Sequence, residues 1–133
     1  KAKLKATGAS LAWFAPRGVG RTAWSGDVKA QTKIRRRFMA LGQTLDGMRV
    51  WDIRRAIQML HFIGAAEVSR VELHATGRMA TNALYAALFE SSVRGLQLTP
   101  ASQSSESPDY LGVYRVTNEA EVQSAVQERV VIR

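Results

Sequence analysis

The sequence contains no cysteine, and this absence excludes disulfide bonds and thiolate zinc sites. It also lacks a secretory signal pattern and any apolar run of the roughly 18 residues that a membrane-spanning helix needs. Acidic residues are few: the sequence has 11 aspartates and glutamates and 19 lysines and arginines, so its net charge is +8. A chain of 133 residues fits one compact domain, so we expect residues 1–133 to form a single domain.

The positive charge favours three kinds of partner, which are nucleic acid, acidic lipid and acidic protein. The basic residues are scattered along the chain, and aromatic residues interleave with them only weakly. The run Arg35-Arg36-Arg37 covers most of a helical turn, which indicates a solvated helix face. We therefore expect a domain with a basic surface, and we favour neither a membrane nor nucleic acid as its partner.

Apolar spacing and turn residues predict alternating strands and helices. The predicted strands are 10–15, 71–75, 93–99 and 129–132, with a strand or an extended crossing segment at 110–116. The predicted helices are 27–41, 44–63, 79–88 and 118–127. This alternation predicts an α/β fold with three layers, α/β/α, around a mostly parallel sheet.

The stretch Val71–Leu88 places a strand and a helix on either side of a tight turn at Thr76–Gly77. A strand that runs into a helix through a glycine turn is half of a βαβ unit. Ligands and catalytic groups of α/β sheets lie at the mouth of such turns. We therefore take Gly77 and its neighbours Thr76 and Arg78 as the centre of the candidate site.

This stretch resembles the nucleophile elbow of the α/β-hydrolase superfamily, in which a small-x-nucleophile-x-small turn follows a strand and opens a helix. The matching residues are Ala75-Thr76-Gly77-Arg78-Met79, and the turn Pro16–Gly20 resembles an Arg-Gly-x-Gly turn after an earlier strand. Residues Met48–Leu60 are similar to the helix before the elbow in the dienelactone-hydrolase, acetyl-xylan-esterase and prolyl-oligopeptidase branches. The DxxxAxxxL pattern of that helix falls on Asp52, Ala56 and Leu60. The resemblance extends over residues 10–132 and implies a partial α/β-hydrolase-like fold.

The departures from this family concern its chemistry. Gly77 stands where the nucleophile is expected, and glycine has no side chain that could attack a carbonyl. His61 and His74 both precede the elbow helix, so neither matches the family's catalytic histidine. The family's acid and the strand with its first oxyanion donor are also unmatched. We therefore expect a piece of a larger protein, in which other segments or a partner chain supply the missing strands.

Three residues outside the turn are candidate binding residues. Arg17 belongs to the Arg-Gly turn, His74 to the elbow strand, and Asp109 to the loop that follows the strand at 93–99. Aspartate, glutamate and histidine do not occur at metal-ligand spacing, so we expect no metal and no cofactor.

We interpret the sequence as an esterase-like domain that lacks its nucleophile and is non-catalytic as it stands. Two alternatives stay open. The first is an active carboxyl-ester or acetyl-xylan hydrolase that is completed by missing segments. The second is a basic module that binds nucleic acid or an acidic partner.

Overall fold

The computed structural model describes residues 9–24, 26–64, 68–100 and 108–133. Its α-helices are α2 (Val28–Ala40), α3 (Leu45–Gly64), α4 (Arg78–Phe89) and α5 (Glu119–Gln127). Its strands are β1 (Val71–Thr76), β2 (Val93–Thr99) and β3 (Val131–Ile132), and two 3-10 turns are η1 (Gly20–Thr22) and η4 (Val113–Arg115). The predicted α/β class is therefore confirmed.

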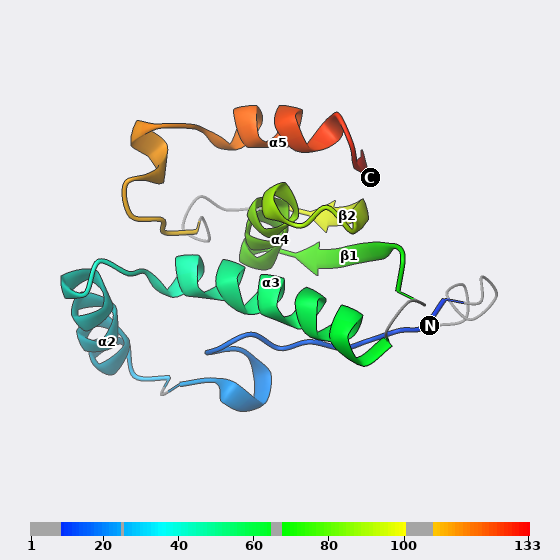
Figure 1. The fold of residues 1–133 in the computed structure, drawn as a ribbon. Coiled ribbons are helices and arrows are strands. Elements are labelled where there is room, and N and C mark those ends of the chain that lie inside the picture. The colour runs from blue at the N-terminus through cyan, green and yellow to red at the C-terminus, as the bar shows by residue number, and fades with distance from the viewer. Residues whose placement is uncertain (1–8, 25, 65–67, 101–107) are drawn as a thin grey trace.

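The strands form one parallel sheet in the order β1-β2-β3. Leu73 of β1 pairs with Leu96 of β2, and Leu96 pairs in turn with Ile132 of β3. Parallel neighbours need a long crossover, and here α4 connects β1 to β2 while α5 lies between β2 and β3 (Figure 1). The chain after α3 is thus two successive β-α-β units, as the alternating pattern predicted.

Helix α4 lies at the centre of the molecule, between α3 and α5 and against β1 and β2 (Figure 1). Eight of its 12 residues are buried, because alanines let neighbouring elements approach it on several sides. Ile53 and Ile57 of α3 and Val122 and Val126 of α5 complete the core around it. This packing holds the start of α4, and with it the turn at Gly77, in a fixed position.

The helix boundaries follow the end signals in the sequence. The Asp27 carboxylate accepts hydrogen bonds from the first turn of α2, including the Ala30 N–H at 3.0 Å. Gly42 adopts a φ of +70° just after α2, where a left-handed residue ends a helix. At α5, the Asn118 side chain accepts from the Glu121 N–H at 3.0 Å. The predicted boundaries of these helices are confirmed to within one or two residues.

The prediction of a strand at 10–15 is wrong. The segment is extended but pairs with no strand in the described part of the chain. Leu11, Trp13 and Phe14 are 48%, 80% and 51% exposed, so the segment is not buried either. Strand propensity alone does not create a strand, because a strand exists only where a neighbour completes its hydrogen bonds.

Two other expectations need correction. Residues 110–116 form no strand, because Gly112 has a φ of +71° and turns the chain into η4. The last strand has only the two residues of β3, and Val131 in it is exposed. The predicted loop at 100–109 lies mostly outside the described residues.

The described part of the chain has one helical layer beside the sheet. Helix α4 contacts both β1 and β2, while Glu72, His74 and Gln97 are exposed along these strands. His74 and Gln97 are register partners and therefore share one face of the sheet. Among the described helices, none is both long enough and apolar enough to cross a bilayer.

Candidate functional site

Gly77 lies at the sharp turn between β1 and α4. Its backbone angles are φ +59° and ψ −139°, a combination that only glycine adopts without strain. Its N–H donates to the Thr99 carbonyl at 2.8 Å, which fixes the turn against the end of β2. No side chain caps α4 at this position. The turn therefore presents backbone atoms where a catalytic side chain could stand.

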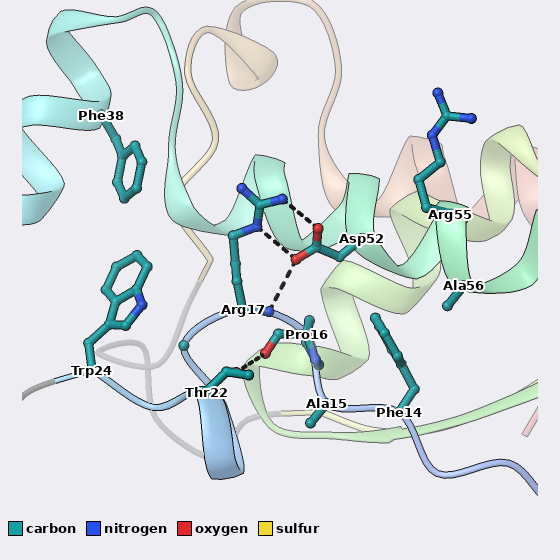
Figure 2. Close-up of a pocket in the computed structure, with 11 residues that line it drawn as sticks. Phe14, Ala15, Pro16, Arg17, Thr22, Trp24, Phe38, Asp52, Arg55 and Ala56 are labelled. Atoms are coloured by element: carbon teal, nitrogen blue, oxygen red, sulfur yellow. Dashed lines mark hydrogen bonds and ion pairs between the residues drawn. The ribbon is translucent and has the colours of Figure 1, made fainter. Parts of the chain in front are cut away.

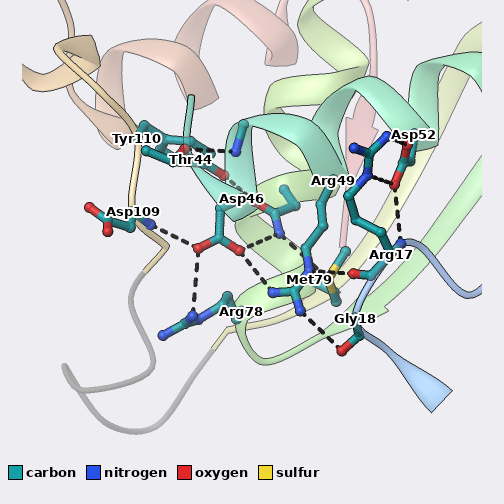
Figure 3. A network of polar contacts seen from close by, with 12 residues as sticks. Arg17, Gly18, Thr44, Asp46, Arg49, Asp52, Arg78, Met79, Asp109 and Tyr110 are labelled. Atoms are coloured by element: carbon teal, nitrogen blue, oxygen red, sulfur yellow. Dashed lines mark hydrogen bonds and ion pairs between the residues drawn. The ribbon is translucent and has the colours of Figure 1, made fainter. Parts of the chain in front are cut away.

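A buried carboxylate lies behind this turn. Asp46, in the first turn of α3, is only 1% exposed. It accepts hydrogen bonds from Arg49 at 3.1 Å and Asn82 at 3.2 Å, and from the Asp109 backbone N–H at 3.0 Å. An Arg78 nitrogen lies 3.6 Å from the second carboxylate oxygen. These groups come from α3, α4 and the loop that contains Asp109, and together they satisfy the buried charge of Asp46; Figure 3 shows Arg49, Arg78 and Asp109 around it.

Asn82 and Tyr110 extend this network into the core. The Asn82 side chain is fully buried, and its amide oxygen accepts a short hydrogen bond from the Tyr110 hydroxyl. The Tyr110 ring packs against Tyr85, with ring centroids 4.6 Å apart. Burial raises the pKa of Tyr110 far above its usual value, and the Asp46 charge adds to the shift. The hydroxyl therefore remains protonated and donates to Asn82.

Arg49 connects the network to the N-terminal loop. Its guanidinium donates to the carbonyl oxygens of Arg17 at 3.1 Å and Gly18 at 3.3 Å, as well as to Asp46. Gly18 has a φ of +72°, and a Cβ there would lie 3.2 Å from the Arg49 guanidinium. Glycine is thus needed both for the turn and for the approach of Arg49.

Arg17 and Asp52 form a second link between the loop and α3. The guanidinium donates two hydrogen bonds to the carboxylate, at 2.8 and 2.6 Å, and the Arg17 backbone N–H donates a third at 3.1 Å (Figures 2 and 3). Hydrogen bonds from Arg17 hold the pKa of Asp52 below its usual value. This bidentate geometry positions the loop and leaves Arg17 engaged with a protein carboxylate.

The predicted site residues are only partly brought together. Arg78 and the Asp109 backbone both contact Asp46, and Arg17 joins them through Arg49. The Asp109 carboxylate turns away from Asp46 and forms a close ion pair with Arg35 of α2.

Two predicted residues lie outside the network. His74 is exposed on β1, with its Nε2 atom 3.4 Å from a Glu72 oxygen, and Thr76 is exposed at the end of the same strand. Among the described residues, neither one forms a hydrogen bond or an ion pair with Asp46 or with the groups that contact it, so the network includes the turn after β1 but not the strand itself.

Sequence reasoning missed the residues at the centre of the network, which are Asp46, Arg49, Asn82 and Tyr110. One signal was available, since Asp46 follows Thr44 at the start of a predicted helix, where an acidic residue is favoured. The partners of Asp46 could not be foreseen, because Asn82 and Asp109 are 36 and 63 residues away in the chain.

An open groove lies on the other side of the Arg17–Asp52 pair. Its volume is about 640 Å³, and it runs between the N-terminal loop, α2 and the middle of α3 (Figure 2). Phe14, Trp24 and Phe38 supply its aromatic walls, and Trp24 stacks on Phe38 with centroids 5.6 Å apart. Arg17 also borders a second groove of about 480 Å³ at the start of α3.

Neither the network nor the grooves contain the groups of a hydrolytic site. Hydrogen bonds among the described residues do not join either histidine to a serine or threonine hydroxyl. The same residues hold no cluster of three or more histidine, aspartate or glutamate side chains that could bind a metal ion. No protein-family model matches the chain, and no significant similarity to a curated protein or a solved structure is found.

Proposed function

We propose that the chain is an α/β-hydrolase-like domain that lacks its nucleophile and does not hydrolyse esters as it stands. The observation that supports this proposal is Gly77. A parallel strand enters a helix through this residue in a conformation of the kind that exposes a nucleophile in α/β-hydrolases, yet the residue carries no side chain.

The surrounding groups support a non-catalytic role. Asp46 accepts hydrogen bonds from Arg49, from Asn82 and from the Asp109 backbone. These contacts engage both of its oxygens, so its carboxylate positions the surrounding segments and is not placed as a general base or acid. Removal of the nucleophile from a catalytic triad lowers turnover by about six orders of magnitude. We therefore propose that the domain has a binding or structural role within a larger protein.

We further propose that other segments complete the sheet in that larger protein. The order β1-β2-β3 leaves one edge of β1 without a partner among the described strands, and such edges pair readily with further strands. Helices from those segments would form the second layer of the three-layer α/β/α arrangement. The same segments would be the source of any histidine and acid in the alternative, active hydrolase.

An active-site probe tests the central claim. We expect a fluorophosphonate to leave the chain unlabelled, and p-nitrophenyl acetate to be hydrolysed no faster than by the heat-unfolded protein. Thr76→Ala and Thr81→Ala remove the hydroxyls that flank the turn in the sequence, and Thr32→Ala on α2 is a matched control. Stoichiometric labelling that disappears in Thr76→Ala or Thr81→Ala, and persists in Thr32→Ala, would show a displaced nucleophile and overturn the proposal.

A further inference from the structure

The charge of the described chain is unevenly divided. Residues 9–24 and 26–64 carry ten arginines and lysines but only three aspartates, and no glutamate. Residues 68–100 and 108–133 carry six basic and six acidic side chains. The interpretation of scattered charge is therefore wrong for these residues, because the excess lies in the half that forms the loop, α2 and α3. We call residues 9–64 the basic half.

The basic half also contains a segment that is extended without a partner. Residues 9–15 run along α3 as an extended trace (Figure 1), and in the described chain no hydrogen bond reaches their backbone groups. Trp13 is 80% exposed and Phe14 51%. An apolar, extended segment whose exposed N–H and C=O groups have no partner in the described chain is a ready template for an added strand.

The groove begins where this segment ends. Phe14 and Ala15 form one wall, the Trp24–Phe38 stack another, and Arg55 projects from α3 at the rim (Figure 2). The Arg55 guanidinium lies 4.6 Å from the centre of the Trp51 ring, and its contacts in the described chain include no carboxylate. The groove therefore offers apolar walls beside Arg55, which pairs with no carboxylate among the described residues, since Asp52 in the same groove pairs with Arg17.

We propose that the segment Ser10–Ala15 pairs with an acidic β-strand of a partner protein, whose apolar side chains enter the groove. Pairing with this backbone requires a partner with its own row of N–H and C=O groups, which a protein strand has and a nucleic acid lacks. The excess of basic residues selects acidic flanking side chains and disfavours a second copy of this chain. This inference does not depend on the hydrolase-like assignment.

The test uses the whole chain and a synthetic probe, acetyl-(Glu-Val)4-amide, which is acidic and strand-forming. The three tryptophans, Trp13, Trp24 and Trp51, all lie in the basic half, so their fluorescence reports binding directly. We expect a saturable change in emission that weakens as salt is raised. A version of the peptide with an N-methyl group on every residue has no N–H donor on either edge, so it cannot form the ladder and is expected not to bind.

Proline substitutions test the pairing itself. Successive N–H groups of a strand point to opposite edges, so Ala12→Pro and Ala15→Pro remove donors from opposite edges. We expect at least one of these substitutions to weaken binding about tenfold, because the free energy of one or two hydrogen bonds corresponds to a change of that size in the dissociation constant. Both should keep the circular dichroism spectrum and melting temperature of the parent, because the backbone there is unpaired. Unchanged affinity in both variants would overturn the proposal.

Charge variants test the acidic character of the partner. Arg55→Glu should weaken peptide binding about fivefold or more, since it reverses the charge at the groove. Arg115→Glu, at another exposed position outside the basic half, is the matched control and should change affinity less than about twofold. Equal effects of the two variants would contradict the proposal. Tighter binding of a 12-residue oligothymidine than of the peptide would replace the protein partner with single-stranded nucleic acid.

Discussion

Helices α2 and α4 have almost the same length, 13 and 12 residues, but α2 lies on the surface and α4 lies in the core. None of the residues of α2 is buried, whereas eight residues of α4 are. Helix α2 begins with a capping aspartate, and α4 begins with a glycine that supplies no cap. Local hydrogen bonds therefore define the ends of α2, and tertiary packing defines the position of α4.

This difference separates stability from recognition in the molecule. The sheet, α4 and α5 contribute most of the buried apolar side chains. The basic half holds the open aromatic groove and much of the exposed apolar surface, including Trp13 and Phe14. Large exposed apolar patches mark interaction surfaces, so we expect substitutions near α4 to affect folding and substitutions near α2 to affect binding.

The largest effect on folding is expected at Asp46, which joins the two regions. Asp46→Ala would leave the Arg49 guanidinium buried without its carboxylate, and the Asn82 amide would lose an acceptor. Breaking a buried ion pair from one side costs about 3–5 kcal/mol of unfolding free energy. Urea denaturation followed by circular dichroism measures this loss.

The control for Asp46 is Asp27→Ala, which removes an exposed carboxylate from α2. A loss at Asp46 no greater than the loss at Asp27 would mean that the network does not hold the two regions together. Asp46→Asn keeps the shape but not the charge, and it should fall between the parent and Asp46→Ala.

Gly77→Ala is expected to have the next largest effect. An L-residue with a side chain is strained at φ +59° and ψ −139°, at a cost of about 2 kcal/mol. Gly26→Ala is the matched control, because a Cβ at Gly26 would meet no atom within 4 Å. The two unfolding free energies, measured in urea, should differ by most of that strain. Equal values would mean that the turn relaxes and does not require glycine.

Tyr110→Phe should cost somewhat less, about 1.5 kcal/mol at neutral pH, because the buried Asn82 oxygen loses its donor. The folded state raises the pKa of Tyr110 above the unfolded value near 10. Above that pH the native state binds more protons than the unfolded state, so the free energy of unfolding falls as pH rises. The full contribution is present below pH 10.

Thermal unfolding between pH 8 and 11 checks this sign. The parent should lose stability as pH rises above about 10, and Tyr110→Phe should lose it with a shallower slope. Tyr114→Phe is the control, because burial raises the pKa of Tyr114 by less than that of Tyr110, so its slope should stay closer to that of the parent. Identical slopes in the parent and in Tyr110→Phe would contradict a buried, protonated Tyr110.

The same contrast explains how far the sequence could predict the structure. Where local chemistry decides, prediction worked: the helices expected at 27–41 and 118–127 begin at the capping residues Asp27 and Asn118, and the range 93–99 is strand β2 as expected. Apolar periodicity also identified α3 and α4, because their packed faces follow the helical repeat. These features depend on neighbours within a few residues in the chain.

Prediction failed where a distant partner decides. Residues 10–15 have the composition of a buried strand, but no described strand lies beside them. The network around Asp46 joins segments up to 63 residues apart, and a single sequence gives no sign of such pairs. The Asp109 carboxylate was assigned to a binding site, yet it pairs with Arg35 of α2, whose side chain stays exposed to solvent as expected.

The smallest predicted effect compares the two helix caps directly. Asp27→Ala and Asn118→Ala each remove a side chain that caps a first turn, at a cost of about 1 kcal/mol. Helix α5 is attached to the core by Val122 and Val126, so Asn118→Ala should lower the global free energy of unfolding by that amount. Helix α2 has no buried residue, so it can open by itself, and Asp27→Ala should mainly speed hydrogen exchange of the α2 amides. Equal losses of global stability in the two variants would show that α2 folds as one unit with the core, and the separation of the two regions would fail.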